Sequence, residues 1–146
     1  MKLYYKILII IAAFFMVIAF SRIFSSISAK TKRDIKVPEI SINKALEFYK
    51  NKSAIFIDPR DKAFYNAERI DGALSYPLQN FVKWKEKIKN KINYDQKIIV
   101  YCDNYMCSMS TIMAQKLIIM GYVNVYVLKG GIEKWKEKQY PMQYSF

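Results

Sequence analysis

The stretch Ile98-Ile-Val-Tyr-Cys-Asp-Asn-Tyr-Met-Cys-Ser108 decides the fold of this chain. It begins with apolar, β-branched residues, which are typical of a buried strand. The pattern changes abruptly at Cys102, and a segment with helical character follows from Ser108. This order predicts a thiol at the carboxyl end of a buried strand, facing the start of a helix. Open α/β sheets form their ligand crevices at that place.

The predicted position of Cys102 allows two interpretations. The free amide groups and the dipole of a helix start favour an anion, so a thiol there tends towards the reactive thiolate. Cysteine is also among the residues most often buried as a small apolar side chain. Spacing alone leaves both interpretations open.

The sequence after the cysteine segment continues the alternation of helices and strands. The capping-type residue Ser108 begins a predicted helix that ends at Gly121. A β-branched strand over 123–128 follows, and the glycine pair at 130–131 then turns the chain into a helix over 132–138.

The sequence before the cysteine segment has the same organisation. Ser41 is expected to cap a helix over 42–50, and Pro59 ends a buried strand over 54–58. The remaining predicted elements are a short helix over 61–66, a strand over 73–76, a long helix from Pro77 to about 90 and a strand over 98–101. Strands that alternate with helices predict an α/β fold, a parallel central sheet with helices on both faces.

The ordered series of motifs resembles a rhodanese (sulfurtransferase) domain over about Ser41 to Pro141. Each motif alone is weak, but their order is specific. The matching residues are Ala54-Ile-Phe-Ile-Asp-Pro-Arg60, Glu68-Arg-Ile-Asp-Gly-Ala73 with Arg69 where histidine is usual, Tyr76-Pro77, Val100-Tyr-Cys102, Ser108, Leu117 to Tyr122, Asn124-Val-Tyr-Val-Leu-Lys-Gly-Gly-Ile132, Trp135 and Tyr140-Pro141.

The resemblance implies a single rhodanese-like domain over 39–146, which needs no cofactor. Cys102 would be the nucleophile, which takes sulfane sulfur as a persulfide and passes it to a thiol acceptor. Asp58 and Arg60 would support the site. The six-membered loop from Cys102 to Cys107 favours sulfur over phosphate, because the related phosphatases have a longer loop. The active-site loop would also include Asp103, Asn104, Tyr105, Met106 and Ser108.

Three loop residues depart from the family pattern. An arginine is common where this chain has Cys107, and a glycine is frequent where Tyr105 stands. Without that arginine the loop lacks a cation for an anionic sulfur donor. Asp103 next to the nucleophile adds a negative charge, which opposes both such donors and the thiolate. We therefore expect only weak activity with thiosulfate.

Cys107 also has two interpretations, and they lead to different functions. It is either a small residue that closes the loop or a resolving thiol that forms a disulfide with Cys102.

The sequence is compatible with three functions. The first function is sulfur transfer to small-molecule or protein thiols. The second is thiol–disulfide or persulfide redox chemistry with both cysteines. The third is a catalytically silent rhodanese module that binds a partner, because fold alone does not establish activity.

The N-terminal segment is the most apolar part of the chain. Ile7 to Phe20 has no polar residue, and Lys2, Lys6 and Arg22 flank it. Residues 1–24 are therefore expected to be a membrane anchor or signal segment, followed by a basic linker over 25–38. Counting basic residues favours a cytoplasmic domain, whereas the signal-like organisation favours export. We expect a single-pass anchor with the domain on the extracytoplasmic side, or a secreted protein after cleavage.

Composition argues against nucleic-acid binding, histidine-dependent catalysis and a metal site. The net charge is +12, but the lysines at 83–91 surround Trp84, Ile88 and Ile92 at helical spacing, which predicts a solvated helix face. We therefore expect no nucleic-acid partner. The sequence has no histidine and only two cysteines, which rules out catalytic pairs with histidine and argues against a metal site.

Overall fold

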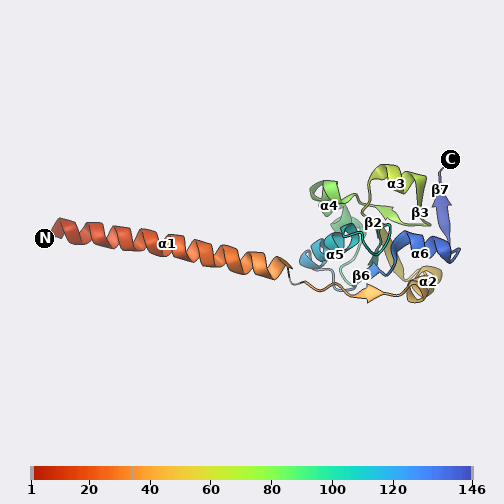
Figure 1. The fold of residues 1–146 in the computed structure, drawn as a ribbon, viewed down its shortest axis with the longest axis horizontal. Helices are drawn as coiled ribbons and strands as arrows, with labels where there is room; N and C mark the ends of the chain where they lie inside the picture. The colour runs from red at the N-terminus through yellow and green to blue at the C-terminus, as the bar shows by residue number, and fades with distance from the viewer. Residues whose placement is uncertain (1, 34, 146) are drawn as a thin grey trace. The chain divides into compact units, whose positions relative to one another are not determined.

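The computed structural model describes the backbone of residues 2–33 and 35–145, and the side chains of 4–23 and 35–145. The chain divides into two units, Met1–Lys36 and Val37–Phe146. Figure 1 shows the elements of both units coloured in chain order.

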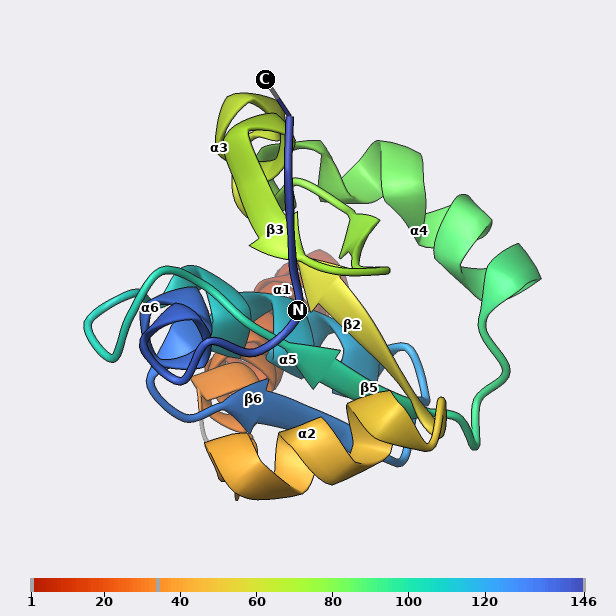
Figure 2. The same cartoon turned by 90° about the vertical axis from the view of Figure 1, so that its right-hand side faces the viewer.

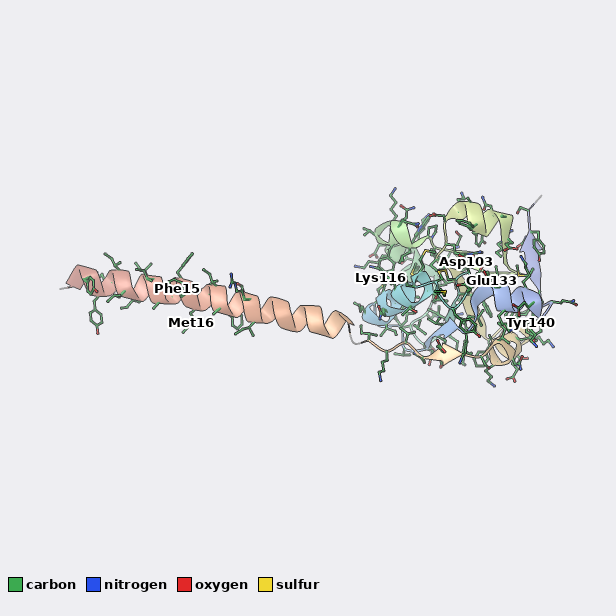
Figure 3. The ribbon with its side chains drawn as sticks, in the orientation of Figure 1. Phe15, Met16, Asp103, Lys116, Glu133 and Tyr140 are labelled. Carbon is green, nitrogen blue, oxygen red and sulfur yellow. A yellow bond between two sulfur atoms is a disulfide. The ribbon has the colours of Figure 1, made fainter. Side chains whose placement is uncertain are left out.

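The first unit is one helix, α1 (Lys2–Arg33). Its segment Tyr4–Ile23 is 20 residues long and apolar enough to cross a membrane. The side chains of this segment are exposed, including Phe15 and Met16 (Figure 3). A membrane anchor and an N-terminal signal sequence both have these properties. The helix continues through much of the segment that the sequence analysis assigned to a linker.

The second unit is built on a five-stranded parallel sheet, which confirms the predicted α/β class. The strand order is β1-β6-β5-β2-β4, so β5 lies in the centre between β6 and β2 (Figure 2). The strands are β1 (Glu39–Ile40), β2 (Ala54–Asp58), β4 (Leu74–Ser75), β5 (Lys97–Val100) and β6 (Val125–Leu128).

Helices cover both faces of this sheet, as predicted, because the side chains of its buried strands alternate between two cores. Ile98 and Val100 of β5 pack with α4 (Phe81–Lys91) and α5 (Met109–Ile119). Ile99 and the following Tyr101 pack on the opposite face with α2 (Ile42–Lys50) and α6 (Gly131–Glu137). The central strand is therefore buried from both sides.

A second, two-stranded sheet lies beside the second core. It pairs β3 (Glu68–Ile70), which directly follows α3 (Lys62–Ala67), with β7 (Met142–Tyr144) in antiparallel register. Trp135 of α6 is fully buried, and its ring nitrogen donates to the carbonyl of Pro141, 2.9 Å away. This bond connects the last helix to the chain that leads into β7.

The sequence predicted the starts of three helices with different success. The Ser41 side chain accepts a bond from the Lys44 amide, which confirms the predicted cap of α2. Ser108 already has helical backbone angles, and its hydroxyl makes no capping bond, so the predicted cap of α5 is wrong. The long helix expected from Pro77 also begins later. The amide of Leu78 bonds to the carbonyl of Pro59, and a 3-10 turn (Leu78–Asn80) precedes α4.

Candidate active site

Cys102 lies just beyond the carboxyl end of the central strand. The amide of Tyr101 makes a backbone bond with the carbonyl of Ile57 at 3.2 Å, and the chain then leaves the sheet. Cys102 follows with only 1% of its surface exposed. The structure thus places the Cys102 side chain at the carboxyl end of the parallel sheet, where open α/β folds bind ligands.

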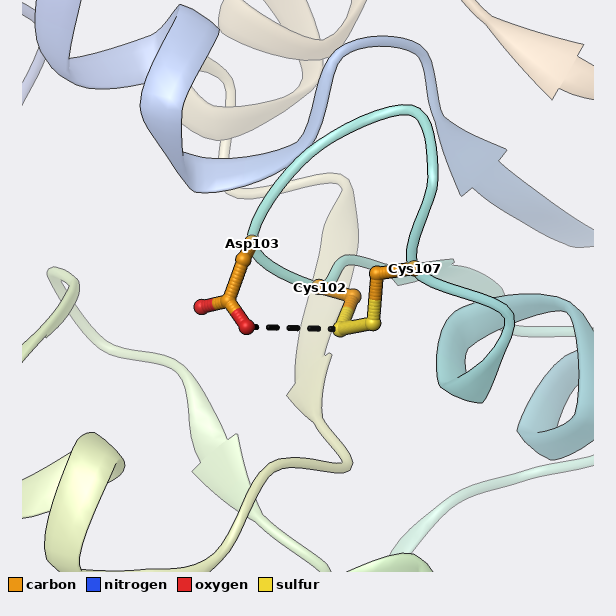
Figure 4. Close-up of side chains that lie close together, drawn as sticks. All are labelled: Cys102, Asp103 and Cys107. Carbon is orange, nitrogen blue, oxygen red and sulfur yellow. Dashed lines mark hydrogen bonds between the residues drawn. A yellow bond between two sulfur atoms is a disulfide. The ribbon is translucent and has the colours of Figure 1, made fainter.

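The two cysteines of the loop are joined as a disulfide, as Figure 4 shows. Their Cα atoms are 6.0 Å apart, within the range that disulfides adopt. The sequence analysis left this bond open, because five residues of separation do not determine how tightly a loop folds.

The start of the loop is fixed by the first turn of α6. The backbone carbonyl of Cys102 accepts a bond from the amide of Ile132 at 2.8 Å, and that of Asp103 accepts one from Glu133 at 3.0 Å. Gly131 permits this close approach, because a Cβ atom there would collide with both carbonyl oxygens. The sequence analysis expected the glycine pair only to turn the chain; its contact with the cysteine loop was missed.

Asn104 organises the middle of the loop. Its side-chain oxygen accepts a bond from the Met106 amide at 3.0 Å, and its backbone carbonyl accepts one from Cys107 at 3.3 Å. Its side-chain amide donates to Glu133. In the disulfide form these two backbone amides therefore bond to Asn104 and not to the sulfur of Cys102.

A buried cation connects the loop to the sheet. Arg60 is 1% exposed, and its guanidinium makes two-pronged contacts of 2.8–3.2 Å with the fully buried Asp58. It also donates to a carboxylate oxygen of Asp103 at 2.9 Å and to the carbonyl of Glu68 at 2.7 Å. Burial disfavours the cation, but the bonds and charge of Asp58 outweigh this effect and raise the Arg60 pKa. Of the two predicted supporting residues, Arg60 thus contacts the cysteine loop through Asp103, and Asp58 holds Arg60.

Tyr101 packs beneath this cation, a contact that the sequence analysis missed. The guanidinium lies 5.6 Å from the centre of the Tyr101 ring. Burial of the phenol, together with the negative charge of Asp58, raises the Tyr101 pKa, so the residue is neutral near pH 7. The buried side of the site therefore combines one cation, one anion and a neutral phenol.

Asp103 lies between the cation and the disulfide. One of its oxygens contacts Arg60, and the other is 4.0 Å from the sulfur of Cys102 (Figure 4). Ligand atoms of Cys102, Asp103 and Cys107 all lie within 4.8 Å of one another. The two sulfurs are bonded to each other, however, so neither is the thiolate that a metal ion would require.

The outer part of the loop faces solvent. Tyr105 is 66% exposed and Met106 is 94% exposed, while Cys107 is half-buried. Ser108 is exposed at the end of the loop. The loop thus has a buried, fixed sulfur at one end and a more accessible sulfur at the other.

The Arg60 contacts generate a stability prediction. Arg60→Met leaves the buried Asp58 carboxylate without its cation, so we expect the free energy of unfolding to fall by about 3–5 kcal/mol. Urea denaturation of the full chain in detergent, followed by tryptophan fluorescence, measures this change. The double variant Asp58→Asn/Arg60→Met should recover part of the loss. A loss no larger than that of Lys44→Met, which breaks an exposed ion pair with Glu47, would contradict this assignment.

Comparison with known proteins identifies the family to which this chain is similar. The family model for the rhodanese-like domain matches residues 41–138. The thiosulfate sulfurtransferase GlpE of Glaesserella parasuis serovar 5 is 30% identical over 108 residues, which are 74% of this chain and 94% of that protein. The corresponding protein of Coxiella burnetii is 33% identical over 98 residues, 67% of this chain and 86% of its own.

Solved structures show the same fold. The BH2092 protein of Bacillus halodurans superposes with a TM-score of 0.66 and 25% identity, covering 85% of each chain. A rhodanese-related protein of Thermoplasma volcanium has a TM-score of 0.58 at 24% identity, covering 73% of this chain and 97% of its own. The family model and the relatives of 30% identity or more establish that the chain belongs to the rhodanese-like family.

Proposed function

We propose that this chain is a membrane-tethered sulfurtransferase that holds sulfane sulfur as a persulfide on Cys102. The observation that supports this function is the position of Cys102 at the carboxyl end of β5, with its carbonyl fixed by α6. The match of residues 41–138 to the rhodanese-like family supports the proposed chemistry.

Sulfur transfer requires the reduced loop. The Cys102 thiolate attacks the outer sulfur of a donor and forms a Cys102 persulfide. The leaving group is an alkyl thiolate if the donor is an alkyl persulfide, or sulfite if the donor is thiosulfate. An acceptor thiolate then attacks the outer persulfide sulfur, which restores the Cys102 thiolate. Each step moves one neutral sulfur atom, so neither step needs an external oxidant or reductant. While the sulfur of Cys102 is bonded to Cys107, it cannot act as this nucleophile.

The charges near the loop disfavour thiosulfate as the donor. Arg60 is already occupied by two carboxylates, Asp58 and Asp103, so these three groups leave one negative charge uncompensated. A dianionic donor is repelled there, whereas a donor with less charge, such as an alkyl persulfide, pays a smaller penalty. The sequence analysis treated Asp103 as unpaired; its bond to Arg60 reduces the repulsion but does not reverse it.

A second candidate function, persulfide reduction, is favoured by the disulfide. The Cys107 thiolate would attack the inner sulfur of a Cys102 persulfide, expel hydrosulfide and form the disulfide that joins the two residues. The persulfide bond breaks and the new disulfide forms, so atoms and electrons balance. Sulfur transfer and sulfide release would then share the same first intermediate.

Two cysteine variants test these functions. The full chain is reduced, freed of reductant and incubated with an alkyl persulfide or thiosulfate before intact-mass analysis. We expect Cys107→Ser to retain one added sulfur atom and Cys102→Ser to retain none. The wild-type chain should gain sulfur, then lose it as hydrosulfide while its disulfide returns. Thiosulfate should load the chain about tenfold more slowly than the alkyl persulfide, because of the uncompensated charge.

Two results would contradict these functions. Sulfur retained equally by Cys102→Ser would show that Cys102 is not the carrier. Wild-type chain that holds its persulfide as long as Cys107→Ser does would exclude the reductive step but leave sulfur transfer intact.

The tether and its orientation are part of the same proposal. The length and apolar composition of Tyr4–Ile23 support a single-pass anchor. The disulfide supports an extracytoplasmic location for the domain, because disulfides persist in oxidising compartments and are rare in the cytosol. The membrane, a sulfur donor and a thiol acceptor, either small molecules or proteins, are therefore the proposed partners.

Charges placed in α1 test the tether. Ile11→Lys combined with Phe14→Lys places two cations near the centre of the apolar segment, each costing about 2.5–3.5 kcal/mol on insertion. We expect this variant to leave the membrane fraction after an alkaline wash, whereas Ser21→Lys, near the segment end, stays in it. Signal peptides are about 15–30 residues long. Recovery of the wild-type chain without roughly its first 25 to 30 residues would therefore contradict anchoring.

A further inference from the structure

The two residues of the disulfide differ in exposure. Cys102 is 1% exposed, and its backbone is held by α6. Cys107 is half-buried and directly follows Tyr105 and Met106, two large side chains that project into solvent. Among the described loop residues, the exposed apolar side chains are the two that precede Cys107. A partner that contacts them therefore approaches the disulfide from the Cys107 side.

We propose that a protein dithiol docks on Tyr105 and Met106 and reduces the disulfide by attacking the sulfur of Cys107. This inference rests on the proposed function, because it describes how the reduced Cys102 is regenerated. The partner thiolate bonds to Cys107, the disulfide bond breaks, and Cys102 leaves as a thiolate that takes a proton. The second partner thiol then attacks its neighbour in the mixed disulfide and releases Cys107. Two electrons and two protons pass to this chain, and the partner becomes a disulfide.

The difference in burial directs the attack to Cys107. Thiol–disulfide exchange needs a thiolate to reach the attacked sulfur. At Cys102 the approaching thiolate would enter a buried site and meet the Asp103 carboxylate, 4.0 Å from the sulfur. Cys107 is the more exposed of the two residues, although its sulfur lies within 4.8 Å of the same carboxylate.

The short loop explains why the reductant is a dithiol. After a monothiol attacks Cys107, the released Cys102 remains close, because the two Cα atoms are 6.0 Å apart in the closed loop. Its high effective concentration lets it attack the mixed disulfide and close the loop again. A dithiol escapes this reversal, since its own second thiol removes it from Cys107.

The exposed side chains explain why the dithiol belongs to a protein. Met106 is 94% exposed and Tyr105 is 66% exposed, and both directly precede Cys107 in the loop. Amphipathic aromatic and flexible thioether side chains are enriched in protein interfaces. A small dithiol would leave both side chains in solvent, whereas a protein surface would bury them around the reacting sulfurs.

Reduction rates of the full-length chain test the docking surface. A bacterial thioredoxin is the protein dithiol, and dithiothreitol at the same concentration is the small one. We expect thioredoxin to open the wild-type disulfide at least about tenfold faster, and Met106→Ser and Tyr105→Ser each to remove most of that advantage without changing the dithiothreitol rate. Val82→Ser, at an equally exposed apolar residue of α4, is the matched control and should change neither rate.

The attacked sulfur is identified by trapping. Thioredoxin without its second cysteine should form a mixed disulfide with Cys107, located by peptide mass spectrometry. A mixed disulfide at Cys102, a thioredoxin rate no higher than that of dithiothreitol, or equal effects of the loop and control variants would each overturn the inference.

A separate measurement distinguishes failure of this inference from failure of the proposed function. Chain reduced by dithiothreitol and then freed of it needs no protein dithiol, so its persulfide loading depends on Cys102 alone. If this chain loads sulfur while the thioredoxin experiment fails, only the docking inference is wrong. If it does not load sulfur, the proposed function is wrong whatever thioredoxin does.

Discussion

The compensation of one buried positive charge is the interaction on which the site depends. Leaving Arg60 without partners in the interior would cost several kcal/mol, so the fold must bring acceptors to it. They come from three parts of the chain: Asp58 at the end of β2, the carbonyl of Glu68 in β3 and Asp103 in the cysteine loop. This convergence holds the central sheet, the small sheet and the loop together. It also fixes the residue that follows Cys102, and α6 holds the same place from the other side.

The pair of cysteines turns this fixed site into one with two chemical states. Closed, the disulfide withholds the Cys102 nucleophile, and Asn104 occupies two loop amides. Opening the disulfide would free the Cys102 sulfur for the proposed sulfur transfer at the end of the central strand. In our proposal the disulfide is opened at the more exposed Cys107, and the transferred sulfur is held on the buried Cys102. A chain exported to an oxidising compartment would need such a route back to the thiol.

The sequence predicted the elements that local patterns determine and missed those that depend on distant contacts. The runs of apolar residues over 54–58 and 98–101 identified β2 and β5 nearly to the residue, because burial on both faces leaves a continuous signal. The strands β1, β3 and β7 have two or three residues each, too few for any periodicity, and only their pairing defines them. In the site, Cys102 was found from its place after a strand. The bond from Arg60 to Asp103 was not, because it joins residues 43 positions apart.

The central claim is that the loop favours the ionised form of Cys102 once the disulfide is open. The Asp103 carboxylate opposes that form, so the backbone amides now bonded to Asn104 must turn towards the sulfur and outweigh it. The most direct measurement is the rate of iodoacetamide alkylation of the Cys107→Ser chain as a function of pH. The rate should rise at a lower pH in the folded chain than in the same chain unfolded in urea. A rise at the same or a higher pH, or a folded chain that does not react, would contradict the account.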